Sequence, residues 1–209
     1  IKQYQGDRQI GLCVDEWGTW FDVEPGTNPG FLYQQNTMRD ALVAAINLNI
    51  FNNHCDTVVM SNIAQTVNVL QAVVLTEGAK LVLTPTYHVF EMYKGHQDAR
   101  QLESYIETAV IGGSQVPDLH ISASQRDDGT VLVTVANLDD NSPVELDCAV
   151  TGLGKLCEVS GRVLSGAIGD YNDFGSADNV NPAALTAELT GDGFKATLPA
   201  CSVAAFILK

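Results

Sequence analysis

The pattern of apolar residues changes near residue 75, and this change constrains the fold of the 209-residue chain more than any other feature. Before it, short apolar runs alternate with segments that repeat apolar residues at helical spacing. After it, short β-prone runs follow one another with turn residues between them. The first pattern predicts parallel strands joined by crossover helices, and the second predicts a β-sandwich. We therefore expect two units, residues 1–75 and residues 76–209.

Two short runs are predicted to be the strands of the first unit. Ile10–Val14 is continuously apolar apart from one glycine, which is typical of a strand buried on both faces of a parallel sheet. The run TVVM at 57–60 predicts the second strand. Because a helical segment separates the two runs, the strands should lie parallel, with a right-handed crossover between them.

Two helices are expected in the same unit. The first should begin near Thr37, where Asp40 three residues later resembles a capping box, and should end at the polar segment NNHCD, residues 52–56. Residues 62–75 follow the second strand and place apolar side chains at i, i+4, i+7 and i+11. This spacing predicts an amphipathic second helix.

The second unit is predicted to consist of strands. Leu81–Tyr93 is a β-prone stretch in which Pro85 indicates an edge strand or a bulge. Residues 119–137 predict a hairpin with its turn at Asp128-Gly129. Further β runs follow at 143–150, 155–164 and 194–208.

Composition excludes several classes of partner. The chain has 25 acidic and 11 basic residues and a net charge of −14, so it should repel the phosphate backbone of nucleic acids. No segment reaches the run of about 20 apolar residues that would cross a bilayer, so no membrane partner is expected. A neutral ligand such as a sugar is compatible with this charge.

The cysteines and histidines predict neither a metal site nor a cofactor. Five cysteines are scattered without a C-x-x-C pair, and the four histidines share no ligand spacing. Small buried thiols in a reducing compartment are the favoured interpretation, which points to the cytoplasm. Cys148 and Cys157 flank the short segment TGLG, so one disulfide across a hairpin stays open as an alternative.

The segment VDEWGTW, residues 14–20, places an acid where a buried strand ends. At the carboxyl end of a parallel strand, Glu16 would lie on the face where α/β barrels position catalytic groups. A helix cap or an arginine partner is the structural alternative for such an acid. Asp15 precedes it, and alternation along a strand predicts that Asp15 faces the helices or has a structural partner.

Two long segments show a family resemblance. VDEWGTWFDVEPGTNPGFLYQQNTMRDALVAAINLNIFNNH and MSNIAQTVNVLQAVVLTEGAKLVLTPTYHVFEMYKGH are similar to the C-terminal part of glycoside hydrolase family 51, the α-L-arabinofuranosidases. The similarity is nearly continuous from Gly11 to His96 and resumes at VSGRVLSG, residues 159–166, and at DYNDF, residues 170–174. It implies a partial (β/α)8 barrel, the last two β/α units, followed by an all-β sandwich of jelly-roll type.

The resemblance also implies roles for individual residues. Glu16 matches the catalytic nucleophile, and Trp20 and Gln65 match residues that line the sugar site and bind arabinose. The alternatives are loop packing for Trp20 and a backbone contact at a helix start for Gln65. The family often has Asn-Val where this chain has Gly18-Thr19, a difference that should alter the shape of the loop.

The implied function is retaining hydrolysis of terminal arabinofuranosyl residues in arabinan or arabinoxylan. The acid/base of the family lies in an Asn-Glu pair on an upstream strand, and these 209 residues contain no Asn-Glu dipeptide. We therefore expect a C-terminal fragment that is inactive alone, from a parent protein that forms a homo-oligomer. An export signal in the missing part would allow secretion or a periplasmic location.

Two other functions remain open at this point. A non-catalytic carbohydrate-binding or structural module would use the β-sandwich as its working part. A related furanosidase or glucanase on the same barrel would differ in substrate and share the mechanism.

Overall fold

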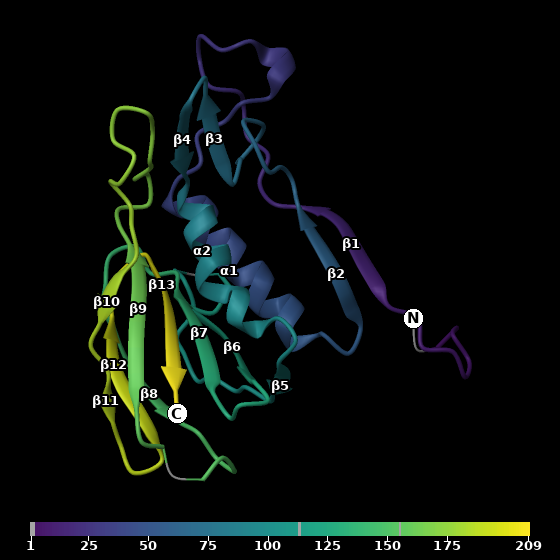
Figure 1. Cartoon of the computed structure of the whole chain (residues 1–209), viewed down its shortest axis with the longest axis vertical. Coiled ribbons are helices and arrows are strands. Elements are labelled where there is room, and N and C mark those ends of the chain that lie inside the picture. Colours follow the sequence, from purple (N-terminus) through teal and green to yellow (C-terminus); the bar gives the residue numbers. More distant parts are fainter. Residues whose placement is uncertain (1–2, 113, 155) are drawn as a thin grey trace.

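Two parallel strands and the helix between them form the first part of the fold. The computed structural model describes residues 3–112, 114–154 and 156–209. Strand β1 (Leu12–Trp17) lies beside β2 (Val58–Ile63), with Leu12 paired to Val58 and Trp17 paired to Ile63. Helix α1 (Met38–Asn53) connects them (Figure 1). The predicted strand–helix–strand order and the parallel pairing are confirmed.

Helix α1 begins and ends where the sequence predicts. Thr37 and Asp40 form a capping box, in which the Thr37 backbone N–H donates to Asp40 Oδ2 at 2.9 Å. This arrangement satisfies amide groups that the first helical turn leaves without partners. The helix buries Met38, Asp40, Ala41, Leu42, Ala44, Ala45 and Asn49.

The predicted helix at residues 62–75 is wrong. Its first residues belong to β2, residues 64–73 form loops and bends, and β3 (Val74–Glu77) begins at its end. Asn68 and Leu70 have φ angles of 57° and 52°, which a right-handed helix does not allow. The apolar spacing therefore arises from residues in separate segments.

The second helix lies further along the chain. After the β3–β4 hairpin, in which β4 spans Lys80–Leu83, helix α2 spans Pro85–Tyr93. Thr84 caps it by accepting the Tyr87 backbone N–H at 3.4 Å. Pro85 occupies the first turn, where a missing N–H costs nothing. Pro85 therefore starts a helix, and its predicted place at a strand edge or bulge is wrong.

The rest of the chain forms two antiparallel sheets. One has the order β10-β9-β13-β7-β6-β5, and the other has the order β11-β12-β8. The predicted hairpin is confirmed as β6–β7, and the three later runs are confirmed as β8, β9 and β12–β13, although Lys155 lies outside the described residues. The bounds are β5 (Arg100–Leu102), β6 (Leu119–Gln125), β7 (Val131–Asn137), β8 (Val144–Ala149), β9 (Val159–Ser165), β10 (Ala183–Leu185), β11 (Glu188–Leu189), β12 (Gly193–Leu198) and β13 (Ser202–Leu208).

The six-stranded sheet has a hydrophobic core on each face. One core lies between the two sheets and includes Phe194 and Phe206, whose ring centroids are 4.5 Å apart. The other includes residues of α1, α2 and the six-stranded sheet, together with Trp17 from β1. Figure 1 shows the resulting layers, with the two helices crossing between the sandwich and the β1–β2 pair.

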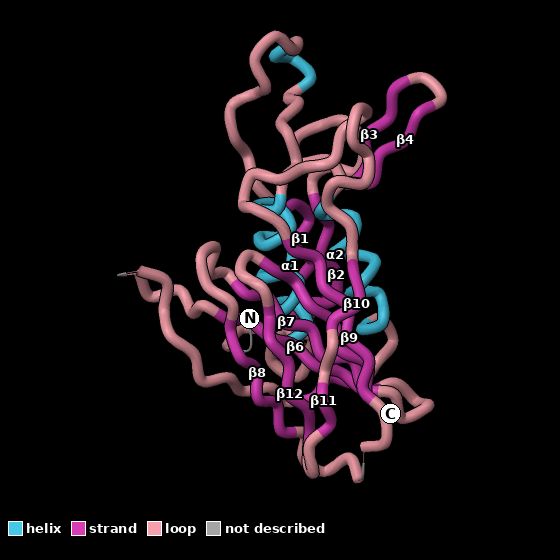
Figure 2. Tube along the Cα trace, turned by 90° about the vertical axis from the view of Figure 1, so that its left-hand side faces the viewer, coloured by secondary structure: helices cyan, strands magenta, loops and turns pink. Residues whose placement is uncertain are grey.

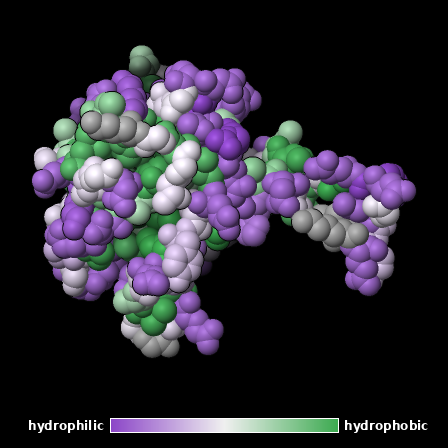
Figure 3. Space-filling view, turned by 90° about the horizontal axis from the view of Figure 1, so that it is seen from below, coloured by the Kyte–Doolittle hydropathy of each residue, from purple (hydrophilic) through white to green (hydrophobic). Residues whose placement is uncertain are grey.

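The β1–β2 pair is more exposed than the sequence predicts. In β1, Trp17 is buried, whereas Leu12 is 42% exposed, and Val59 and Met60 of β2 are 68% and 55% exposed. A strand buried on both faces was expected at 10–14, and this is wrong for the described chain because no further strand pairs with β1 or β2 there. The arm that begins the chain projects from the body (Figure 3).

Short segments complete the fold at the end opposite the sandwich. The hairpin β3–β4 and the loop that contains the 3-10 helix η1 (Pro29–Phe31) project there (Figure 2). A second 3-10 turn, η2 (Lys94–His96), follows α2. No helix among the described residues has the length and apolar character needed to span a membrane.

Candidate active site

Glu16 and Gln65 lie at the same edge of the parallel pair. Glu16 is the penultimate residue of β1, and Gln65 follows the last residue of β2 by two positions. Both side chains line one open hollow of about 440 Å³, and both residues are exposed. The remaining lining residues are Asp15, Ile63, Ala64, Thr66 and Val67. The structure thus brings together two of the three residues predicted for the site.

Asp15 has a structural partner, as predicted, but it also borders the hollow. The Cys13 thiol donates to Asp15 Oδ1 at 2.9 Å, and this hydrogen bond raises the pKa of the thiol. The pairing of β1 with β2 is irregular between Val14 and Trp17, so simple alternation of side chains does not apply there.

The two tryptophans have different environments. Trp17 is buried, with its ring stacked on Phe90 at a centroid distance of 6.1 Å and edge-on to Phe51 at 5.5 Å. Trp17 is therefore part of the core. Trp20 is 65% exposed and is not among the residues that line the hollow.

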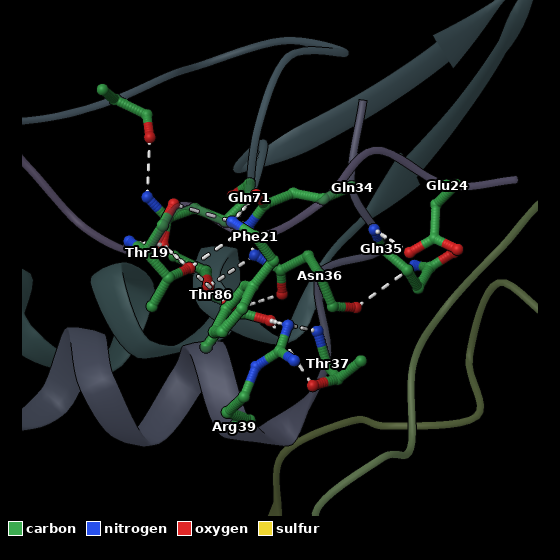
Figure 4. Close-up of polar contacts among 12 residues, drawn as sticks. Thr19, Phe21, Glu24, Gln34, Gln35, Asn36, Thr37, Arg39, Gln71 and Thr86 are labelled. Carbon is green, nitrogen blue, oxygen red and sulfur yellow. Dashed lines mark hydrogen bonds and ion pairs between the residues drawn. The ribbon is translucent and has the colours of Figure 1, made fainter. Parts of the chain in front are cut away.

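A buried amide links the loops that follow the two strands. Gln71 is 2% exposed, and its Oε1 accepts the Thr19 backbone N–H at 2.7 Å. Its Nε2 donates to the Ala64 carbonyl at 2.6 Å. The Ala64 N–H in turn donates to the Trp17 carbonyl at 3.0 Å. The two strand ends are thus connected both directly and through one side chain. Figure 4 shows Gln71 beside Thr19.

The same loop is anchored to the first turn of α1. The Thr19 hydroxyl lies 2.6 Å from Asp40 Oδ1 and 2.6 Å from Gln71 Oε1. Asp40 also accepts a hydrogen bond from Arg39 at 3.0 Å, and the Arg39 guanidinium stacks over the Phe21 ring at 3.7 Å. Because Asp40 is buried, each of these donors offsets the cost of removing its carboxylate from water.

Two further amides extend this polar network. Gln34 Oε1 accepts the Phe21 N–H at 2.7 Å. Asn36 donates to the Gln71 carbonyl at 2.8 Å and to the Thr86 hydroxyl at 2.7 Å, which connects the loop to the start of α2. Figure 4 shows these side chains converging between the strand ends and the two helices.

Comparison with known proteins identifies the family. A model of the family described as the α-L-arabinofuranosidase C-terminal domain matches residues 15–202. The chain belongs to this family. The predicted resemblance is therefore confirmed, and the match covers the strand-end site and the sandwich up to the start of β13.

Individual relatives agree with this assignment. The intracellular exo-α-L-arabinofuranosidase of Bacteroides ovatus is 41% identical over 214 residues, which are 100% of this chain and 41% of that protein. The crystal structure of the GH51 arabinofuranosidase from Xanthomonas axonopodis pv. citri has a TM-score of 0.90 at 46% identity, over 96% of this chain and 41% of that one. A family 51 α-L-arabinofuranosidase from Bifidobacterium longum has a TM-score of 0.82 at 25% identity, over 96% of this chain and 42% of that one.

The arabinofuranosidase C-terminal chain spans about two fifths of the length of these relatives.

Within residues 3–112, 114–154 and 156–209, no group of three or more His, Cys, Asp or Glu side chains could hold a metal ion. Cys148 has a free thiol, so its possible disulfide with Cys157 is not formed, and burial raises the pKa of the Cys148 thiol to about 11.

Sequence reasoning missed the polar network around the strand ends. Gln34, Asn36 and Gln71 were not among the predicted site residues. For Gln71 the reason is that the sequence predicts a helix at 62–75, which does not form. One signal was present: Gln71 interrupts the apolar run VLQAVVL. A polar side chain inside an apolar run must be hydrogen-bonded if it is buried, so such a residue indicates a local network.

Proposed function

We propose that this chain supplies the nucleophile of a retaining α-L-arabinofuranosidase and that Glu16 is that nucleophile. One observation supports this most directly: the Glu16 and Gln65 side chains line the same hollow at the carboxyl ends of two parallel strands. That end is where barrel enzymes position their catalytic groups. The family membership and the relatives named above agree with the proposal.

In this proposal Glu16 attacks the anomeric carbon of a terminal arabinofuranosyl residue. The attack forms a covalent glycosyl-enzyme, which water then hydrolyses with overall retention. The Gln65 amide binds the sugar hydroxyls, since it offers both donors and an acceptor. Trp20 presents an aromatic face to the sugar once substrate is bound. Arabinose-containing glycans such as arabinan or arabinoxylan are the proposed substrates.

The second carboxyl group comes from outside these residues. Retaining glycosidases use two carboxyl groups about 5–5.5 Å apart. Asp15 is the other acid that lines the hollow, and it adjoins Glu16 in the chain and accepts a hydrogen bond from Cys13. We therefore infer that the acid/base belongs to the part of the protein that corresponds to the remaining length of the relatives.

The proposed architecture is the last two β/α units of a (β/α)8 barrel, followed by the sandwich. The units are β1–α1 and β2–α2, which carry the parallel strands and their helices. Since α2 ends at Tyr93, we move the proposed boundary from residue 75 to the segment between α2 and β5. The free edges of β1 and β2 would then pair with the other barrel strands, and the complete protein is proposed to be a homo-oligomer.

The test compares two neighbouring acids in the full-length protein that contains this chain. Glu16→Gln should lower kcat on 4-nitrophenyl α-L-arabinofuranoside by roughly 10³-fold or more, because it removes the nucleophile. Asp15→Asn, the matched control, should retain most of the activity. The 209-residue chain alone should release no arabinose. Comparable activity of Glu16→Gln and the parent enzyme would refute the proposal.

A further inference from the structure

Gln71 belongs to the loop that follows β2, is buried against the loop that follows β1, and does not line the hollow. We propose that Gln71 is a positioning residue that fixes the loop after Glu16 and the loop that contains Gln65 relative to one another. This inference rests on the proposed function, because it assigns Gln71 a role in the same site. It goes further in naming a residue that acts through the backbone and does not touch the sugar.

The two ends of the Gln71 amide contact different loops. Oε1 accepts from the backbone N–H of Thr19, three residues after Glu16, at 2.7 Å. Nε2 donates to the carbonyl of Ala64, the residue immediately before Gln65, at 2.6 Å. An amide is the side-chain group that supplies an acceptor and a donor a short distance apart. A glutamate would lose the donor and leave the Ala64 carbonyl opposite a second oxygen.

Gly18 shows that the chain leaves room for this amide. Its φ of 137° lies in a region of backbone conformation that residues other than glycine rarely adopt. A Cβ built on Gly18 would overlap the Nε2 and Cδ atoms of Gln71. The close approach of the loop to Gln71 therefore requires glycine at this position, and the two residues form one unit.

Thr19 connects this unit to the rigid start of α1. Its hydroxyl has one proton and lies 2.6 Å from both Gln71 Oε1 and Asp40 Oδ1, so it can donate to either oxygen. Gln34 Nε2 approaches the same hydroxyl at 3.3 Å. Every group around Thr19 is thus held by at least two partners. Such a supporting network can keep a reactive side chain within the narrow range of positions that catalysis needs.

Loss of Gln71 should therefore affect the reaction more than the binding of substrate. A displacement of about 1 Å at a reacting group can lower the rate by about 100-fold. In the full-length protein we expect Gln71→Met, which keeps the side-chain length, to lower kcat about 10–100-fold and to raise KM by a smaller factor. The Glu16 and Gln65 side chains remain present in this variant, but their positions relative to one another are no longer fixed.

The matched control is Asn49→Leu. Asn49 is another fully buried amide, bonded to the His120 carbonyl and to the Ser122 and Thr134 hydroxyls, and it contacts neither strand end. Both variants should lower the thermal midpoint, but Asn49→Leu should leave kcat near that of the parent enzyme. Equal kcat values in the two folded variants would overturn the inference.

A second pair tests the same network if Gln71→Met does not fold. Thr19→Val removes the hydroxyl and keeps the shape, whereas Thr19→Ser restores the hydroxyl. We expect kcat to fall in Thr19→Val and to recover in Thr19→Ser, and equal values would overturn the inference. Glu16→Gln is measured alongside: if it is inactive while Gln71→Met and Thr19→Val are normal, the positioning role alone fails. If Glu16→Gln remains active, the proposed function fails and the positioning role with it.

Discussion

The indole ring of Trp17 stacks on the phenyl ring of Phe90, with the centroids 6.1 Å apart and the planes 19° apart. Trp17 ends β1 and Phe90 lies in α2, so this contact joins the parallel pair to the second helix. Both rings pack against the core that includes Leu132 and Val203 of the six-stranded sheet. The end of β1 and one face of the six-stranded sheet therefore share one hydrophobic core.

This shared core predicts cooperative unfolding. Phe90→Ala should lower the free energy of unfolding by about 2–3 kcal/mol. This is at or below the low end of the roughly 3–5 kcal/mol lost when a fully buried phenylalanine is replaced by alanine, because the Phe90 ring is half-buried. The measurement is urea denaturation followed by far-UV circular dichroism and by the fluorescence of Trp17 in a Trp20→Phe background. The two signals should change together. A fluorescence transition at clearly lower urea than the dichroism transition would contradict a shared core.

His96 predicts a pH dependence of stability. Its ring nitrogens lie 2.7 Å from the Ser124 hydroxyl and 3.0 Å from the Thr134 hydroxyl, and burial lowers the pKa of the imidazole to about 4. The unfolded chain binds a proton at a pKa of about 6.5, so stability is lost as the pH falls from about 6.5 towards 4.

The effect should be on the order of 2 kcal/mol between pH 7.5 and pH 5. The measurement is urea denaturation at the two pH values for the parent chain and for His96→Gln. Burial also lowers the pKa values of His88 and His120, so both proteins should lose some stability in acid. The parent should lose more. An equal loss of stability in the two proteins would exclude His96 as a source of the pH dependence.

The exposed strands predict self-association of the isolated chain. Val59 and Met60 on β2 are 68% and 55% exposed, and β1 and β2 each have an unpaired edge within the described residues. Exposed apolar strands with free edges readily pair with another chain. Sedimentation velocity should therefore detect oligomers.

A charge on β2 should weaken this association. Val59→Lys should shift the distribution towards monomer, whereas Leu81→Lys should have little effect, since Leu81 is a similarly exposed residue, 60%, on the distant β4. A monodisperse monomer of the unsubstituted 209-residue chain would show that the β1–β2 pair is not a contact surface.

Much of the fold could be predicted from local signals. The capping residues of α1, the turn residues of the β6–β7 hairpin and the apolar runs of the later strands are all set by neighbours in the sequence. Residues 62–75 misled because Ile63, Leu70 and Val74 are apolar for separate reasons: a strand end, a buried loop residue and the start of β3. The signal for the true second helix was Thr84-Pro85, a cap followed by a proline in the first turn.

The candidate site was only partly accessible to sequence reasoning. Glu16 and Gln65 follow from strand ends and from the family motif. Gln71 acts through backbone groups of Thr19 and Ala64, 52 and 7 residues away in the sequence, and its partners are defined only once both loops are folded. The run VLQAVVL indicates that Gln71 is hydrogen-bonded, but no local pattern identifies its partners.

Chemical rescue of a Glu16 variant tests the central claim most directly. In the full-length protein, Glu16→Ala should be nearly inactive on an aryl α-L-arabinofuranoside, because the variant lacks the carboxylate proposed to attack the anomeric carbon. Azide is small enough to enter the space left by the side chain and can attack from the same side. The account predicts that azide restores release of the phenol and that the product is β-L-arabinofuranosyl azide, the inverted anomer. Full activity of Glu16→Ala without azide, or rescue that yields only the α-azide, would contradict it.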